Sequence, residues 1–108
     1  MAQIINVKIL HLPLKAKWYL MQESGEKTEE YREYNEYWYK RLIDSDKLRA
    51  KPYTHVLFRY GYTKRCFIRR IDSITIGMGK PEWGAPDHPV FIIKHSKEYS
   101  PIIKGNQL

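Results

Sequence analysis

The sequence predicts a single small α+β domain in which about five strands form a barrel accompanied by two helices. The chain has 108 residues, of which 43% are hydrophobic, enough for one core but too few for two ordinary domains. Runs of β-forming residues alternate with turn signals, and two segments carry apolar residues at helical spacing. No repeat, linker or low-complexity tract interrupts them, so we expect residues 1–108 to fold as one unit.

The first expected strand spans residues 4–11, where Ile, Val and Leu mix with polar positions as in a half-buried strand. Pro13 should end it, because proline removes a backbone donor. The run lacks a basic leading region, which argues against a signal peptide. No apolar stretch in the chain approaches the roughly 20 residues of a membrane span. We therefore expect a soluble cytoplasmic protein with no membrane partner.

An amphipathic helix should follow this strand. Leu14, Trp18 and Met21 recur at i, i+4 and i+7, with Lys, Gln and Glu between them. Ser24 and Gly25 should end the helix, because glycine suits the left-handed conformation of a helix cap. In the next segment, Tyr31, Tyr34, Trp38 and Leu42 also fall at helical spacing. The pattern alone therefore favours one helix over residues 27–42.

The C-terminal half predicts three strands. Their expected bounds are residues 54–59, 66–76 and 90–94. The first two should pair across the turn formed by Tyr60, Gly61 and Tyr62. We expect a charged loop at residues 44–51 and an irregular loop at residues 80–89, which hold three prolines. The tail from residue 100 gives no clear pattern.

The most informative motif is the octapeptide at residues 25–32, with the spacing G-x-K-x-x-E-x-R. A chance match in a chain of this length has a probability on the order of one in a thousand. The motif resembles the signature of the ASCH family, small stand-alone bacterial or phage members in particular. The resemblance extends to four further segments, at residues 12–15, 37–42, 60–64 and 79–85.

The resemblance implies a PUA-like β-barrel and a different reading of residues 27–42. A short strand at residues 27–33 would be followed by a helix that begins near Asn35, a suitable N-cap. We adopt this second reading. Glu30 and Arg32 would then share one strand face, and Lys27 would enter from the loop end. In the family these positions line a central cleft that is taken as a substrate or RNA site. From spacing alone, solvated charges or a Glu30–Arg32 pair that stabilises a strand are the favoured interpretation, and the resemblance reverses that preference.

The charge distribution favours a polyanionic partner. Nineteen Lys and Arg against twelve Asp and Glu give a formal net charge of +7. Residues 59–70 hold five cations and no acid, interleaved with aromatic residues on which bases can stack: Arg59, Tyr60, Tyr62, Lys64, Arg65, Phe67, Arg69 and Arg70. A basic hairpin with its aromatic residues in the core explains the pattern equally well. Residues 23–36 contain six Glu, so we expect one basic and one acidic face, each open to a protein partner.

Two functions follow from these residues. The first is binding of RNA, another nucleic acid or a nucleotide through Lys27, Glu30 and Arg32 and the basic block at residues 59–70. The second is hydrolysis of a modified nucleoside or of RNA, with Lys27 and Glu30 as catalytic residues and Arg32 orienting them. One branch of the family cleaves an acylated cytidine with a Thr nucleophile at the position of Glu30, a residue that this chain lacks there. We expect the ring of Trp83 to form a lid at the rim of the cleft, and packing of the ring against the barrel end is an interpretation at least as good.

Metal and cofactor sites are not expected. His11, His55, His88 and His95 show no metal-ligand spacing, and Cys66 is the only cysteine. A half-buried strand position is the favoured interpretation of Cys66. The chain has no Walker loop, no nucleophile elbow and no dinucleotide fingerprint, so we expect no nucleotide cofactor of those classes.

Overall fold

A mixed five-stranded sheet with two helices forms the framework of the protein. The computed structural model describes residues 6–98. Its elements are β1 (Ile9–Leu14), α1 (Ala16–Glu23), β2 (Glu29–Glu33), α2 (Glu36–Leu42), β3 (Ile43–Asp44), β4 (Arg49–Ala50), β5 (His55–Tyr60), β6 (Cys66–Gly77), a single 3₁₀ turn (Pro81–Trp83) and β7 (Val90–His95). The expected α+β class and the two helices are confirmed.

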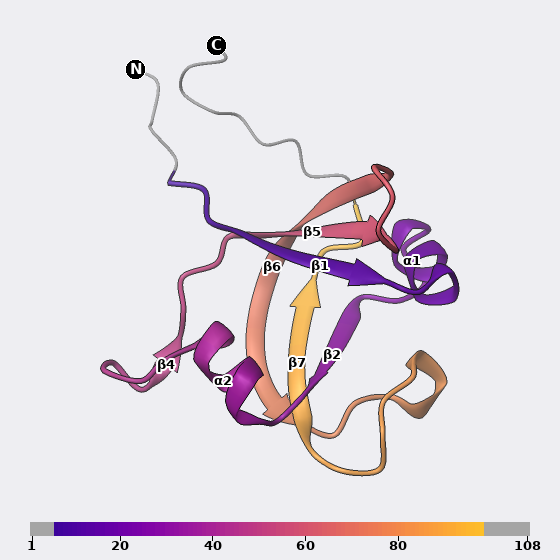
Figure 1. The fold of residues 1–108 in the computed structure, drawn as a ribbon. Coiled ribbons are helices and arrows are strands. Elements are labelled where there is room, and N and C mark those ends of the chain that lie inside the picture. The colour runs from indigo at the N-terminus through magenta and orange to yellow at the C-terminus, as the bar shows by residue number, and fades with distance from the viewer. Residues whose placement is uncertain (1–5, 99–108) are drawn as a thin grey trace.

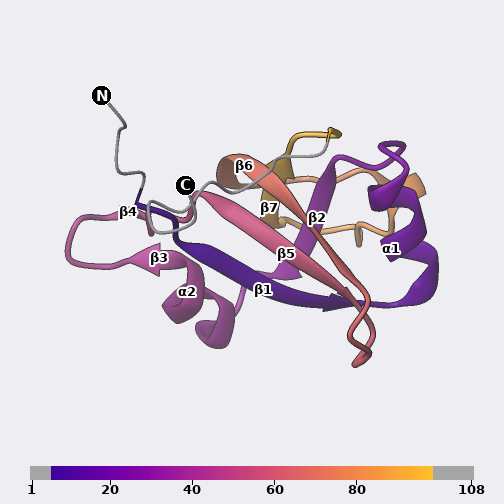
Figure 2. The same ribbon diagram turned by 90° about the horizontal axis from the view of Figure 1, so that it is seen from above.

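The strand order is β1-β5-β6-β7-β2, with β1 parallel to β5 and the other neighbours antiparallel. The long strand β6 pairs first with β5 and then with β7, with a register irregularity between Ile71 and Ser73. At this strand the sheet bends, so that β1 and β5 cross the direction of β7 and β2 (Figures 1 and 2). Within residues 6–98 no strand ladder joins β1 to β2. The closed barrel that we expected is therefore not shown.

Two arginine side chains bond the open edge of β1, one from α2 and one from β2. Arg41 Nη2 donates to the carbonyl oxygen of His11 at 2.7 Å, and Arg32 Nη2 donates to that of Pro13 at 3.1 Å. Pro13 thus lies inside β1 and does not end it, contrary to our expectation. The N–H and C=O of a strand residue point the same way, so the missing donor of Pro13 faces the gap and costs no ladder bond. Of the strand expected at residues 4–11, residues 4–5 lie outside the described part and residues 6–8 are not in the strand.

The core lies on the concave side of the bent sheet. Its buried hydrophobic residues are Leu10, Leu12, Leu14, Tyr19, Leu42, Val56, Phe58, Phe91 and Ile93. Helix α1 buries Tyr19 and Gln22, whereas Trp18 and Met21 are only half-buried. The helix therefore presents a different face to the core than the apolar spacing predicted. It ends as expected, with Gly25 at φ 89°.

The strand-then-helix reading of residues 27–42 is correct, although the strand begins at Glu29 and not at Lys27. β2 pairs along its whole length with β7, and the Asn35 side chain caps α2 by accepting from the backbone N–H of Trp38 at 2.9 Å. The continuous helix that the apolar spacing favours is wrong, because pairing with β7 satisfies the backbone of this segment instead. The segment expected as a loop at residues 44–51 forms most of a short hairpin of β3 and β4, which begins one residue earlier, at Ile43.

The remaining elements agree with expectation to within one residue at either end. Strands β5 and β6 form the expected antiparallel pair. The loop at residues 80–89 is irregular apart from the 3₁₀ turn, which ends at Gly84 with φ 91°. No helix among residues 6–98 combines the length and apolar character needed to cross a bilayer.

Candidate functional site

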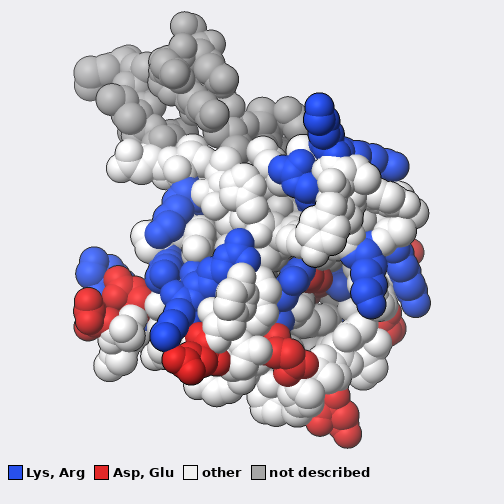
Figure 3. Space-filling view, in the orientation of Figure 1, with Lys and Arg blue, Asp and Glu red and all other residues white. Residues whose placement is uncertain are grey.

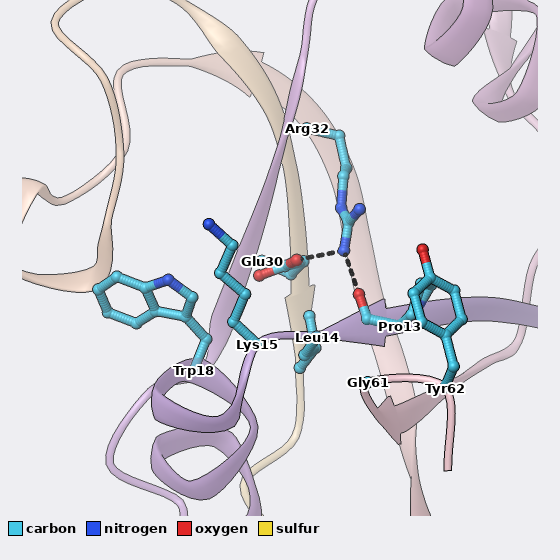
Figure 4. A pocket seen from close by; sticks show the side chains of 8 residues that line it. All are labelled: Pro13, Leu14, Lys15, Trp18, Glu30, Arg32, Gly61 and Tyr62. Carbon is cyan, nitrogen blue, oxygen red and sulfur yellow. Dashed lines mark hydrogen bonds and ion pairs between the residues drawn. The ribbon is translucent and has the colours of Figure 1, made fainter.

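A cleft of about 480 Å³ opens where the sheet is not closed, between β1 and β2. The residues that line it are Pro13, Leu14, Lys15, Trp18, Glu30, Arg32, Gly61 and Tyr62. Figure 4 shows Glu30 and Arg32 between Trp18 and Lys15 on one side and Pro13 and Tyr62 on the other. Two charged residues of the octapeptide therefore border an open cavity that has an aromatic side chain at each end.

Glu30 is the most highly coordinated side chain of the cleft. Its Oε1 accepts from Gln22 Nε2 at 3.2 Å and from Lys27 Nζ at 3.3 Å, and its Oε2 accepts from Arg32 Nη2 at 2.6 Å. Only 6% of the residue is exposed, yet it belongs to the cleft lining. Three donors from three positions hold the carboxyl group as a fixed acceptor.

Lys27 lies behind the cleft and does not line it. The residue is 2% exposed, and its Nζ donates to the carbonyl oxygen of Trp83 at 2.8 Å as well as to Glu30. The ammonium also lies 4.3 Å from the centre of the Trp18 ring, a cation–π distance. Burial lowers the pKa of the Lys27 amine, and the neighbouring Glu30 opposes that change. Lys27 thus supports the site from within and is not exposed to a ligand.

Arg32 is fixed by partners on both edge strands. Its Nη2 bonds both Glu30 in β2 and the carbonyl oxygen of Pro13 in β1. The guanidinium lies 5.0 Å from the centre of the Trp38 ring, on α2. The expected strand-face pair of Glu30 and Arg32 is therefore present, and it spans the gap in the sheet.

A buried polar chain behind Glu30 was not anticipated from the sequence. Gln22 Oε1 lies 2.7 Å from His95 Nε2, and His95 Nδ1 lies 2.8 Å from the carbonyl oxygen of Ser96. Gln22 is fully buried and His95 is 1% exposed. Burial lowers the pKa of the His95 imidazole. Neither residue belongs to a recognisable motif, and only the tertiary structure brings them to Glu30.

The basic block at residues 59–70 does not act as one surface. Tyr62 is 95% exposed and lines the cleft, and Lys64 is exposed nearby in the same turn. Arg59 donates to the carbonyl oxygen of Thr63. Arg65 pairs with Glu23 at 2.8 Å. Most of the block therefore has structural partners.

Arg69 was expected to contact RNA or another ligand, and its position in the structure differs most clearly from that expectation. It is buried, and its Nη2 donates to the carbonyl oxygen of Glu23, the last residue of α1, at 3.0 Å. A cation at a helix C-terminus is favourable because the unpaired carbonyl groups there carry partial negative charge. Arg69 is therefore a structural residue. In a strand it shares a face with Phe67, which packs against the core, and that alternation was the available signal.

Trp83 lies next to the octapeptide, as expected of the residue proposed as a lid. It contacts Lys27 through its backbone carbonyl, and its ring lies 4.2 Å from Lys80 Nζ. The ring does not belong to the cleft lining, so the lid assignment is not supported. Trp18 covers Lys27 instead. A Cβ placed on Gly84 would lie 2.7 Å from the Trp18 ring, so the loop packs directly against it.

The charged surface is mixed. Figure 3 shows Lys and Arg side chains spread over several parts of one face, with acidic groups among them. Three of the six Glu at residues 23–36 pair with exposed or half-exposed cationic or His side chains: Glu23 with Arg65, Glu33 with His88 and Glu36 with Lys40. The separate acidic face that we expected is therefore largely compensated by neighbouring cations.

The remaining reactive side chains of the described residues, 6–98, form no metal-binding group. Cys66 is exposed and not half-buried, which corrects the expected position. Among residues 6–98, no group of three or more His, Cys, Asp or Glu is arranged to hold a metal ion. Comparisons with protein-family models, curated proteins and solved structures gave no match. The resemblance to the ASCH family therefore remains one of motif residues.

Proposed function

We propose that the cleft binds a nucleobase, as a unit of single-stranded RNA or of a nucleotide. The observation that carries this proposal is the fixed Glu30–Arg32 pair, with 2.6 Å between Oε2 and Nη2, bordering a cleft between two aromatic side chains. A carboxyl acceptor beside a guanidinium donor matches the edge of a base, where N–H donors and ring or carbonyl acceptors are adjacent.

Size and aromatic content suit the same ligand. A volume of about 480 Å³ lies within the range of about 300–1,000 Å³ that is typical of small-molecule sites. Tyr62 projects into solvent from the turn between β5 and β6, so it can stack on a base at almost no cost in desolvation. Trp18 supplies a second aromatic surface at the opposite end. Stacking on such a residue contributes about 1–3 kcal/mol per base.

Phosphate contacts are expected to be few. Lys15 borders the cleft and Lys64 follows Tyr62 in the turn, and both are exposed. Two such contacts to a single strand give a slope of log K against log salt concentration of about −1.4. The dependence on salt should therefore be shallower than the net charge of +7 suggests, because most other cations lie elsewhere or are paired.

Fluorescence polarisation with labelled single-stranded RNA tests the proposal. Tyr62→Ala should weaken binding about tenfold, the equivalent of one lost stacking contact. Tyr37→Ala is the matched control, because Tyr37 is also exposed but lies on α2 outside the cleft lining. Absence of binding at low salt, or equal losses in the two variants, would contradict the proposal.

Hydrolysis remains the alternative, supported by the presence of the Glu30 carboxyl at an open cleft. The arrangement favours it less than binding, because Lys27 is buried and its amine donates to two protein oxygens, those of Glu30 and of the Trp83 carbonyl. A reacting amine has to reach the substrate. Screening acylated nucleosides and RNA for product, with Glu30→Gln as the test variant, separates the two functions: binding without turnover rejects hydrolysis.

A further inference from the structure

We propose that His95 and Gln22 are positioning residues that share one proton with Glu30, and so couple the buried core to the acceptor in the cleft. The geometry is a continuous chain of three contacts. It runs from the carbonyl oxygen of Ser96 through His95 and Gln22 to Glu30 Oε1, with heavy-atom distances of 2.8, 2.7 and 3.2 Å. Its importance for a ligand rests on the proposed function of the cleft.

The number of donors in this chain requires the extra proton. Both ring nitrogens of His95 face carbonyl oxygens, those of Ser96 and Gln22, and a carbonyl oxygen only accepts hydrogen bonds. A neutral imidazole carries one N–H and leaves one contact without a donor. Every contact is satisfied when His95 is an imidazolium, because the amide N–H of Gln22 can then donate to ionised Glu30.

A second arrangement satisfies the same contacts with the same number of protons. If the side-chain amide of Gln22 is turned over, its N–H donates to Nε2 of neutral His95 and its oxygen accepts from protonated Glu30. Amide orientation and imidazole protonation are linked in any such chain. The two arrangements differ only by transfer of one proton from His95 to Glu30, accompanied by rotation of the amide. The proton therefore belongs to the pair.

The surroundings do not assign this proton decisively to either end. Burial disfavours charge on His95, as does Arg69, whereas the Ser96 carbonyl, Glu30 and Asp72 favour it. The Phe58 ring packs beside the imidazole and contributes no charge. At the other end, two cations pair with the Glu30 carboxyl group, namely Lys27 and Arg32. When the shared proton leaves as the pH rises, two acceptors face each other somewhere along the chain, and Glu30 is held less firmly.

Nitrogen-15 NMR of the His95 ring in the intact protein tests the proton count without any ligand. We expect Nδ1 to stay protonated from about pH 5 to about pH 8, because it faces the Ser96 carbonyl, while Nε2 alone changes state. A neutral ring protonated at Nε2 with bare Nδ1 would overturn the proposal, since His95 would then donate to Gln22 with no shared proton.

Binding measurements test the consequence for the cleft. The affinity of the wild-type protein for single-stranded RNA should fall about fivefold from about pH 5.5 to about pH 8, the equivalent of one hydrogen bond. His95→Phe and Gln22→Leu should each remove this dependence. His88→Gln should retain it, because His88 is exposed and pairs with Glu33. Unchanged pH dependence in His95→Phe overturns the proposal, whereas the expected ring state without RNA binding at any pH rejects the proposed function alone.

Discussion

Replacing Lys27 by alanine should lower the free energy of unfolding by about 3–5 kcal/mol, the usual cost of breaking a buried ion pair. The variant removes the donor to Glu30 and to the Trp83 carbonyl, and it also empties the space of the lysine stem, about three methylenes worth about 0.8 kcal/mol each. Lys27→Met keeps most of that stem and removes the cost of burying a charge. We expect it to lose only about 1–2 kcal/mol, mainly from the unpaired Trp83 carbonyl.

Urea denaturation followed by tryptophan fluorescence measures both values, and Lys80→Ala is the control. Lys80 is exposed and stacks on the Trp83 ring, so its loss should change the free energy of unfolding by less than about 0.5 kcal/mol. Equal stability of Lys27→Ala and the wild-type protein would show that the ammonium and its stem are not buried as described.

The difference in the free energy of unfolding between the wild-type protein and Lys27→Met should depend on pH. The pKa of Lys27 is lower in the folded chain, where burial disfavours the charged form, than in the unfolded chain. Between these two pKa values the unfolded state binds more protons, so folding stability contributed by this residue rises with pH. The stability of the wild-type protein relative to Lys27→Met should therefore increase toward about pH 10. A decrease would mean that the attraction of Glu30 outweighs burial.

Two further predictions concern residues that hold the cleft in place. Arg69→Ala should lower the free energy of unfolding by about 2–3 kcal/mol in urea denaturation, because it removes a buried guanidinium from the last carbonyl of α1. Arg70 is its exposed neighbour in β6, and Arg70→Ala should cost less than about 0.5 kcal/mol. Similar values for the two variants would contradict the structural role of Arg69. Gly84→Ala should lower the free energy of unfolding by at least about 1 kcal/mol and shift the fluorescence of Trp18. The reason is that Gly84 has φ 91° and that a Cβ there would lie 2.7 Å from the Trp18 ring. An unchanged spectrum and an unchanged stability would contradict this packing.

The local pattern of residues in the sequence was sufficient to predict much of the fold. The strands β5, β6 and β7 are runs of β-forming residues between turn signals, and α1 ends at a glycine with a left-handed conformation. Pattern failed at β2, because Tyr31, Tyr34 and Trp38 have helical spacing while the backbone is satisfied by β7, about 60 residues along the chain. Non-local pairing of this kind leaves no periodic trace in one sequence.

The site was only partly predictable for a related reason. Glu30 and Arg32 could be placed together because residues two apart share a strand face. Trp18, Gln22 and His95 could not, because their contribution depends on how α1 and β7 pack behind β2. For the basic block at residues 59–70, the sequence predicted a shared role that the structure does not show. Its cations look alike in the sequence, but Arg69 is buried and structural. The residue of the block that lines the cleft beside Gly61 is the aromatic Tyr62.

The structure gives each fixed position of the octapeptide a physical reason. Gly25 lets the chain leave α1 through a left-handed conformation, at a place where a Cβ would lie only 3.3 Å from Lys97. Lys27 follows before β2 begins, so its side chain is free to turn beneath Glu30. Arg32 then shares the face of Glu30 and crosses the gap to β1. Moving the arginine by one residue would send it to the opposite face of β2, where it could reach neither partner. The spacing therefore places the Glu30 carboxyl group where the Lys27 amine and the Arg32 guanidinium both donate to it, at the gap between β1 and β2.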